Sequence, residues 1–197
     1  MRKIVVANHV TLDGVMQAPS GKDEDASNDF AHGGWGAPRV DDVLVGKMGE
    51  SMRTSDTLLF GRRTYDQFAG YWPHQTDGNP YTEALNRRDK YVASSTLSEP
   101  LPWENSILLS GDVPAAVTAL KQQQGKDVVI LGSGQLIRSL MAHNLIDEFL
   151  LMIHPVVLGS GERLFADGVA PAAFDLVDST PTTTGVVIAT YRLGEAR

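Results

Sequence analysis

The sequence predicts one α/β domain of three layers, in which helices cover both faces of an eight-stranded, mostly parallel sheet that ends in an antiparallel hairpin. Two observations carry this prediction. Short apolar runs alternate with segments of helical periodicity, and no linker or repeat divides the chain. The last two apolar runs are only about eight residues apart, too few for a crossover helix, so we expect them to pair antiparallel.

The strands are read from short segments rich in apolar and β-branched residues. The run Val128–Leu131 is apolar at every position, which suits a central strand covered on both faces. In chain order, the expected strands are Lys3–Val10, Thr57–Gly61, Lys90–Ser94, Ser106–Leu109, Val128–Gly132, Glu148–Val157, Ala173–Val177 and Val186–Arg192.

The helices are read from periodicity and from the residues that punctuate them. Pro114 in a first turn and Gly125 just past a last turn are the favoured arrangement for one helix. The segment Thr11–Ala37, rich in Gly, Asp and Ser, is expected to be a long functional or mobile loop. The expected helices are one containing Val40, Leu44, Val45 and Met48, followed by Thr64–Ala69, Val113–Gln124 and Gln135–His143.

Composition restricts the class of protein. The chain has 197 residues, 42% hydrophobic and 21% charged, which fits a single globular domain over residues 1–197. A net charge of -7 without a basic run argues against nucleic acid or a membrane surface as partner. No segment approaches the roughly 18 to 20 apolar residues of a membrane span, and Ile4–Ala7 is too short for a signal peptide. We therefore expect a cytoplasmic protein.

Metal and thiol chemistry are not expected. There is no cysteine, which removes disulfides, thiol nucleophiles and Cys-ligated zinc together. The histidines show no metal-ligand spacing, so structural or exposed roles are expected for all five, which are His9, His32, His74, His143 and His154.

The first candidate binding turn joins an apolar strand directly to a helix at Gly61. Free N–H groups and the positive end of the helix dipole favour an anion there, and the Thr64 hydroxyl could donate to a phosphate oxygen. Arg62 and Arg63 add positive charge with fork geometry. The alternative is that Gly61 only makes the turn and that both arginines are solvated.

The second candidate turn, Gly132-Ser133-Gly134, has the same strand-to-helix design. Its glycines allow the backbone to curl into a cradle of N–H groups around a pyrophosphate. It is not GxGxxG, because Ile137 holds the place of the third glycine, and no acidic ribose partner follows. A third strand end offers the hydroxyls of Ser94 and Ser95 at the same edge of the sheet, with an ordinary polar loop as the alternative.

These pieces, in this order, resemble the dihydrofolate reductase-like superfamily. The branch they resemble most is the reductase domain of bifunctional riboflavin-biosynthesis proteins and its stand-alone relatives. The family has an eight-stranded, mostly parallel sheet with a C-terminal hairpin. The segments that carry the resemblance are Thr11–Gly14, Gly33–Trp35, Leu59–Tyr65, Ser94-Ser95, Leu131–Gly134 and Leu158–Phe165.

The resemblance implies hydride transfer from NADPH to a C=N bond of a pyrimidine or pteridine derivative. By position, the first turn resembles the family's site for the pyrophosphate and 2′-phosphate, Ser94 and Ser95 its adenosine-phosphate side, and the second turn its diphosphate cradle. Asn8 would border the nicotinamide. The cofactor-binding residues implied are Asn8, Gly61, Arg62, Thr64, Ser94, Ser95, Gly132, Ser133, Gly134, Gln135 and Leu136.

Two positions depart from the family pattern. Gln135 stands where the family often has an arginine that meets the 2′-phosphate, so NADPH preference rests mainly on Arg62, with Arg63 in support. Dihydrofolate reductases present a carboxylate on the helix after the first loop. Counted back from Gly61 without gaps, that place holds the apolar Val45, which argues against dihydrofolate as substrate. Nearby carboxylates, which another alignment would need, are Asp41, Asp42 and Glu50.

Three residues are candidates on the substrate side. Asp13 occupies the aspartate of the S-x-D-G pattern of the riboflavin branch, which makes it the candidate catalytic and substrate-binding carboxylate; alternatively, Asp13-Gly14 is only a tight-turn pair. Trp35 could stack on a flat heterocycle or anchor its loop. Glu162 could reach the mouth of the site or lie in a solvated loop.

The sequence thus leaves three functional hypotheses. The first is an NADPH-dependent reductase resembling 5-amino-6-(5-phosphoribosylamino)uracil reductase, acting on a small heterocyclic substrate. The others are reduction of dihydrofolate and a nucleotide-binding module without chemistry. The zinc-dependent deaminase of the bifunctional proteins is excluded because the chain has no cysteine. Relatives in this branch often form homodimers, which makes a homodimer an expectation by analogy.

Overall fold

The sheet of the protein carries all eight expected strands. The computed structural model describes residues 1 to 194. The strand order is β4-β3-β2-β5-β1-β6-β8-β7, parallel from β4 to β6 and antiparallel at β6–β8 and β7–β8, which confirms the predicted C-terminal hairpin. The strands are β1 (Ile4–Thr11), β2 (Ser55–Gly61), β3 (Asp89–Ala93), β4 (Ser106–Leu109), β5 (Asp127–Leu131), β6 (Glu148–His154), β7 (Phe174–Pro181) and β8 (Val187–Leu193).

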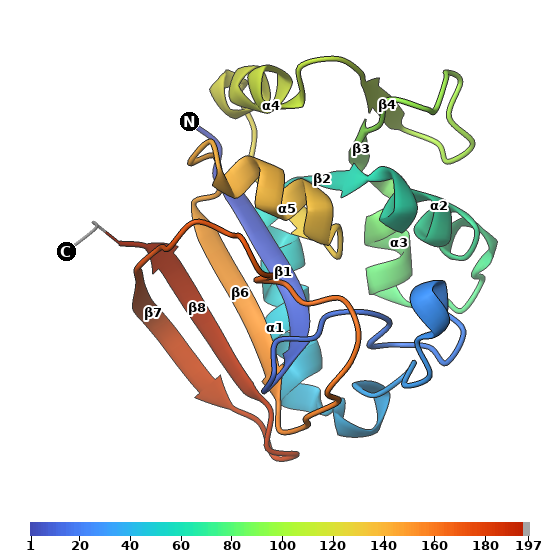
Figure 1. Cartoon of the computed structure of the whole chain (residues 1–197). Coiled ribbons are helices and arrows are strands. Elements are labelled where there is room, and N and C mark those ends of the chain that lie inside the picture. The colour runs from blue at the N-terminus through green and yellow to red at the C-terminus, as the bar shows by residue number, and fades with distance from the viewer. Residues whose placement is uncertain (195–197) are drawn as a thin grey trace.

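Helices cover both faces of the sheet and make the three predicted layers. In Figure 1, α5 lies in front of β1 and α1 lies behind it. The core clusters agree, because α4 and α5 pack in one cluster while α1, α2 and α3 pack against the opposite face. The helices are α1 (Asp42–Thr54), α2 (Arg62–Ala69), α3 (Pro80–Arg87), α4 (Val113–Gln122) and α5 (Gly134–Met141).

The central strand β5 shows why the sheet needs two helical layers. Val128 and Ile130 pack on the side of α4 and α5, whereas Val129 and Leu131 pack on the side of α1 to α3. A strand that is apolar at every position can be buried on both faces only if helices cover both. The core therefore consists of two apolar layers, one on each side of the sheet.

Three expectations about the elements need correction. Helix α3 was not foreseen, although Asn79 accepts a hydrogen bond from the Tyr81 N–H and Pro80 opens the helix, both of which are start signals. Helix α1 begins at Asp42, so Val40 lies outside it in extended backbone. Strand β6 ends at His154, because Pro155 has no N–H to continue the ladder.

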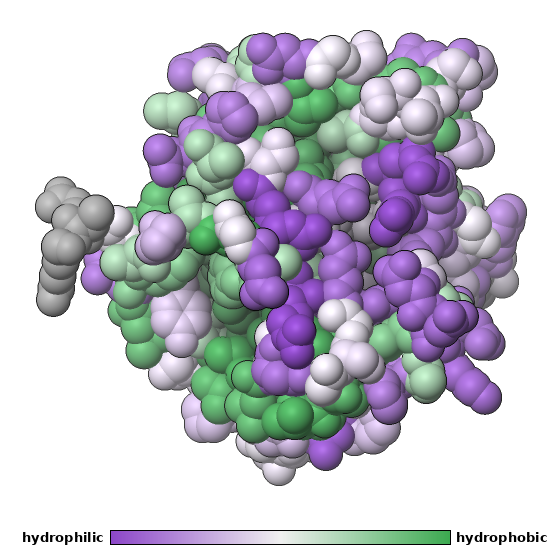
Figure 2. Space-filling view, in the orientation of Figure 1, coloured by the Kyte–Doolittle hydropathy of each residue, from purple (hydrophilic) through white to green (hydrophobic). Residues whose placement is uncertain are grey.

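The C-terminal end of the sheet is the least covered. Strand β7 is an edge strand, and Leu176 and Val177, where its register is interrupted, are both exposed. Figure 2 shows apolar side chains on this open part of the sheet and hydrophilic ones over the region where α2 and α5 begin. Within residues 1–194, no helix is both long enough and apolar enough to cross a membrane.

The cap of α3 gives a test of this architecture. Replacing Asn79 by Ala removes the acceptor for the Tyr81 N–H, so the free energy of unfolding should fall by about 1 kcal/mol. Asn79→Asp keeps an acceptor and should retain most of that stability. Urea denaturation measures both. Equal stability of Asn79→Ala and the parent protein would contradict the assigned cap.

Candidate functional site

The two candidate turns lie side by side at a point where the sheet changes direction. Strands β2 and β5 are parallel neighbours, so Gly61 and Gly132 follow strand ends at the same edge. The helix after β5 covers one face of the sheet, whereas the helices after β2 and β1 cover the other. In open α/β sheets, ligands bind at the carboxyl ends of strands where the helices diverge in this way.

The helices at these turns differ from the others in how they begin. Helices α1, α3 and α4 are each capped by an Asp or Asn side chain, namely Asp41, Asn79 and Asp112. Helices α2 and α5 have no side-chain cap. The N–H groups of Gly134, Gln135 and Leu136 have no acceptor among the described residues. The only two α-helices without a side-chain cap in residues 1–194 therefore begin at the two candidate turns, where their free N–H groups favour an anion.

Ser133 joins the two turns. Its backbone N–H donates to the Thr64 hydroxyl at 3.0 Å, and its own hydroxyl accepts the Gly61 N–H at 3.0 Å. The hydroxyl also donates to the Leu131 carbonyl at 3.2 Å. Ser133 thus leaves its own helix uncapped and fixes the distance between the starts of α2 and α5. The Thr64 oxygen accepts from Ser133, which leaves the Thr64 hydroxyl proton for a ligand.

Asn8 joins the second turn to β1. Its side-chain oxygen accepts the Gly132 N–H at 2.7 Å, and its side-chain nitrogen donates to the Gly132 carbonyl at 3.2 Å. The amide therefore continues the β1–β5 ladder beyond Leu131. Asn8 is buried, and both of its polar functions are used by one residue of the turn. Asn8 thus lies next to the second turn, where its contacts make it a support for the cradle; its place beside a nicotinamide stays a prediction.

The backbone of the second turn requires small residues. Gly132 and Ser133 both have a φ of 60°, in the left-handed region. A Cβ on Gly132 would lie 3.0 Å from Thr64 Cγ2, and one on Gly134 would lie 3.1 Å from Met16 Sδ. Side chains at these glycines would disturb the cross-turn contacts or the start of α5. The curled backbone and uncapped helix fit a diphosphate group, as the sequence predicts.

The charges at the first turn belong to exposed side chains. Arg62 is half-exposed and pairs with Asp66, with 3.0 Å between Nη1 and Oδ2. An exposed pair of this kind is worth about 0.2–1 kcal/mol, so Arg62 can leave it for a phosphate at little cost. Arg63 is exposed as well. At the third strand end, the Ser94 hydroxyl accepts the N–H groups of Thr96 and Leu97, and Ser95 is exposed.

Asp13 is held as an ionised structural carboxylate. It accepts hydrogen bonds from the Thr11 hydroxyl at 2.6 Å and from the N–H groups of Leu158 and Gly159 at 3.2 and 2.8 Å. The Thr11 bond is the main cause that lowers the pKa of Asp13 to about 2. A carboxyl group that stays ionised at neutral pH is a poor proton donor. These contacts favour the turn role that the sequence left open over the catalytic one.

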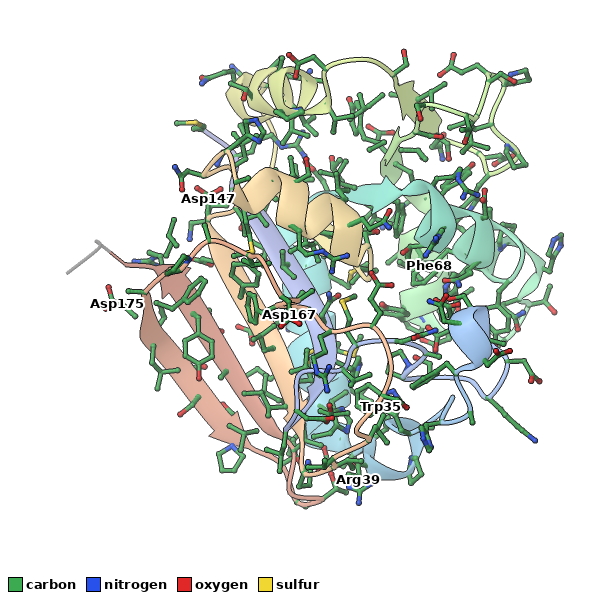
Figure 3. All side chains as sticks on the ribbon, viewed as in Figure 1. Trp35, Arg39, Phe68, Asp147, Asp167 and Asp175 are labelled. Carbon is green, nitrogen blue, oxygen red and sulfur yellow. The ribbon has the colours of Figure 1, made fainter. Side chains whose placement is uncertain are left out.

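Trp35 and Glu162 hold the two long loops against each other. The Trp35 indole N–H donates to the Gln17 carbonyl at 2.7 Å, and the ring is buried, which favours the anchoring role over stacking on a ligand. Figure 3 shows Trp35 and Arg39 near the carboxyl ends of β1 and β6. Glu162 pairs with Arg138 at 3.0 Å and lines a cavity of about 410 Å³ between the loops, where Gln17 also lies.

A pair of histidines beside the site was not singled out by its spacing. His9 Nδ1 lies 2.8 Å from His154 Nε2, on the neighbouring strands β1 and β6. Burial, with a smaller effect of His154, lowers the pKa of His9 to about 3. Burial, with a smaller effect of Arg39, lowers the pKa of His154 to about 4. The signal in the sequence was their position at the ends of two strands that the fold places together.

Comparison with known proteins identifies the class to which this fold belongs. Two solved structures share nearly the whole fold. A riboflavin biosynthesis protein from Shewanella sp. PV-4 is 23% identical with a TM-score of 0.69, covering 98% of this chain and 99% of that one. Dihydrofolate reductase from Enterococcus faecalis, complexed with NADP(H), is 14% identical with a TM-score of 0.62, covering 98% and 97%. The chain therefore has a dihydrofolate reductase-like fold.

The sequence comparison narrows the class to a family. Residues 2–188 match the model of the RibD C-terminal domain, and the chain belongs to this family. The protein YyaP of Bacillus subtilis (strain 168) is 30% identical over 195 residues, which cover 96% of this chain and 94% of YyaP. Membership of the family suggests an oxidoreductase related to the reductases of riboflavin biosynthesis.

The role of Asn8 can be tested by its removal. Asn8→Ala leaves both polar groups of Gly132 without their partner, so the free energy of unfolding should fall by about 1–3 kcal/mol. The Gly132 amide should also exchange with solvent faster. Asn8→Asp keeps the acceptor but not the donor, so its free energy of unfolding should lie between those of Asn8→Ala and the parent protein. Hydrogen exchange and urea denaturation measure these effects, and an unchanged Gly132 exchange rate in Asn8→Ala would be contrary to the assigned role.

The histidine pair predicts how stability depends on pH. In the folded protein, both histidines have a pKa below the ordinary histidine value of 6.5. At a pH between these lowered values and 6.5, the unfolded chain therefore binds more protons than the folded chain. The contribution of the pair is therefore fully present above pH 6.5 and is lost as the pH falls through the folded pKa values. Stability should already decrease from pH 6.5 to about pH 5, where unfolded carboxyls are still ionised.

Two variants isolate this effect. The double variant His9→Gln with His154→Gln should show a flatter stability profile between about pH 5 and pH 6.5. His143→Gln, at an exposed histidine away from the pair, should keep the steeper profile of the parent. Chemical denaturation at several pH values provides the comparison. Identical slopes in all three proteins would rule out the pair as the cause.

Proposed function

We propose that the protein binds NADPH and reduces a C=N bond in a pyrimidine or pteridine-type heterocycle. The observation that carries the proposal is the pair of uncapped helix starts that Ser133 bonds together at the carboxyl edge of the sheet. Family membership supports a reductase. Three solved proteins of this fold support the proposal by their names or ligands: one is named for riboflavin biosynthesis, and one is a reductase complexed with NADP(H). The third, from Thermotoga maritima, is described as a deaminase and 5-amino-6-(5-phosphoribosylamino)uracil reductase.

The residues present fit the dinucleotide. In this proposal, the N–H groups of Gly134, Gln135 and Leu136 hold the diphosphate, because they are free and carry the positive end of the α5 dipole. Arg62 binds the 2′-phosphate, with Arg63 beside it and Ser94 and Ser95 on the adenosine side. When bound, NADPH supplies the hydride from its nicotinamide ring. Asn8 keeps the cradle in register with β1, next to where that ring would lie.

Dihydrofolate is the less favoured substrate. Counting back from Gly61 without gaps places Val45 where dihydrofolate reductases have their carboxylate. Val45 is 56% exposed on α1 and has no polar group to orient a pteridine. Asp41 is used as the α1 cap and also accepts from Thr183. Glu50 pairs weakly with Lys47 at 3.8 Å. The nearby carboxylates are therefore engaged or, like Asp42, exposed on the surface.

Turnover separates the three functional hypotheses. Purified protein is mixed with NADPH, and the near-UV absorbance of NADPH is followed with pterins, aminopyrimidines, flavins and dihydrofolate. The proposal expects NADPH oxidation with a pyrimidine or pterin whose C=N bond is reduced. Oxidation with dihydrofolate at an ordinary enzymatic rate would remove the argument from Val45. Binding of NADPH without turnover of any compound would favour a nucleotide-binding module.

Arg62 gives a prediction about cofactor choice. Arg62→Ala should weaken NADPH binding about 10- to 100-fold, because a charge-assisted bond to phosphate contributes on the order of 1.5–3 kcal/mol. NADH binding should hardly change, since NADH lacks the 2′-phosphate. Asp66→Asn is the matched control: it removes the negative partner of Arg62 and should leave NADPH binding equal or tighter. Calorimetric titration measures both, and equal losses for NADPH and NADH in Arg62→Ala would disprove the role.

A further inference from the structure

The histidine pair lies at the carboxyl ends of β1 and β6, at the same edge of the sheet as the candidate turns. His9 pairs in register with Met152, which packs against Leu44 of α1, so the His9 side chain lies on the α1 face of the sheet. It follows Asn8 directly and lies at the carboxyl end of β1. Strand β1 borders β5 there, and the chain of β5 continues into the Gly132 turn. His9 is therefore beside the cradle, on the opposite face of the sheet from Asn8.

His154 is sealed beneath the long loop. It is 0% exposed, and the Trp35 ring meets it edge-on with 5.1 Å between centroids. The Trp35 N–H is already given to the Gln17 carbonyl, so it does not serve His154. Gly36 closes over the ring, and a Cβ there would lie 3.3 Å from His154 Cε1. Among residues 1–194, His154 Nδ1 is buried without any hydrogen-bond partner.

The unpartnered Nδ1 of His154 indicates which of the two histidines donates the hydrogen bond between them. Both rings are neutral at pH 7, because their pKa values are lowered, so a single N–H joins them. If His9 donated, His154 would carry its own proton on the sealed Nδ1, which would be a buried donor without an acceptor. If His154 donates from Nε2, its Nδ1 has only an unpaired acceptor lone pair. Buried orphaned donors are rarer than under-satisfied acceptors, so the second arrangement is favoured.

The second arrangement leaves His9 with an N–H that has no partner among the described residues. When His9 Nδ1 accepts from His154, the remaining proton of the neutral His9 ring must be on Nε2. His9 Nε2 makes no hydrogen bond to the described residues. Unlike His154 Nδ1, it is not a fully buried atom. His9 is half-buried, and its Nε2–H is an unpaired donor directed away from His154.

We propose that His9 donates its Nε2–H to the nitrogen of the substrate's C=N bond, and that His154 positions His9 by fixing its tautomer. This inference rests on the proposed reductase function. When the carbon of the bond accepts a hydride, the π electron pair moves to the nitrogen, which then takes a proton from water. His9 gives up no proton; its hydrogen bond stabilises the electron pair as it develops. A neutral imidazole can serve in this way as an electrophile.

The tautomer can be tested on the protein alone. Two-dimensional ¹H–¹⁵N spectra of the imidazole rings distinguish which nitrogen carries the proton. At neutral pH, His9 and His154 should both be protonated on Nε2, whereas in His154→Leu the His9 ring should become a mixture of tautomers. Protonation of His9 on Nδ1 in the parent protein would overturn the inference, whatever the protein reduces.

Contact with the substrate class can be tested without turnover. Titration with diaminouracil should shift the His9 Nε2 resonance and leave His143 unchanged, because His143 is exposed beyond the C-terminal end of α5, away from the candidate turns. A shift with diaminouracil, together with no NADPH oxidation by any compound of the turnover panel, would mean that the reductase function fails while the hydrogen-bond contact of His9 with this heterocycle stands. Absence of a shift at saturating diaminouracil would refute the role of His9.

Turnover variants test the role in catalysis on the compound that the parent reduces. His9→Phe removes the donor and should lower kcat about 100-fold, the usual effect of losing one donor to a developing charge, with NADPH affinity unchanged. His9→Gln retains a side-chain N–H and should stay within about tenfold of the parent. His143→Phe is the surface control and should be unaffected. An unchanged kcat in a folded His9→Phe, or equal losses for Phe and Gln, would contradict the donor role.

Discussion

The candidate site depends on the hydrogen bonds of Ser133. Its N–H and its hydroxyl connect the starts of α2 and α5 through Thr64 and Gly61, while Asn8 secures the adjacent Gly132 to β1. Three strand ends are thereby held in one geometry before any ligand arrives. A preorganised set of donors loses little entropy on binding. This arrangement explains why Ser133 adopts a left-handed backbone and leaves its own helix uncapped.

The surrounding loops are held by Asp13 and Trp35, two residues that the sequence also offers as catalytic or substrate-binding candidates. The Asp13 carboxylate is saturated by hydrogen bonds from Thr11 and from the loop after β6, and Trp35 closes the long loop over His154. These contacts keep the loops in place without adding a proton donor. The polar groups left for a ligand are those at the helix starts, the exposed arginines and His9. In the proposed function, the helix starts and the arginines bind the dinucleotide and His9 contacts the substrate, all at one edge of the sheet.

Much of the fold could be predicted from the sequence, because periodicity and turn residues report local structure. All eight strands and the final hairpin followed from apolar runs and a short connection, whereas α3 was missed despite Asn79 and Pro80. The neighbouring turns were foreseen because parallel strands end at one edge. Side-chain partners could not be foreseen: the saturation of Asp13 and the meeting of His9 with His154 depend on strand register and loop packing far apart in sequence.

The coupled turns are proposed to hold a dinucleotide. Backbone amide ¹H–¹⁵N spectra recorded during titration with NADPH test it most directly, because they report each N–H separately. The largest shifts should come from the amides of Gly134, Gln135 and Leu136, together with those of Arg62 to Thr64, while amides of β7 stay unchanged. Shifts confined to other parts of the chain, or none at millimolar NADPH, would contradict the account.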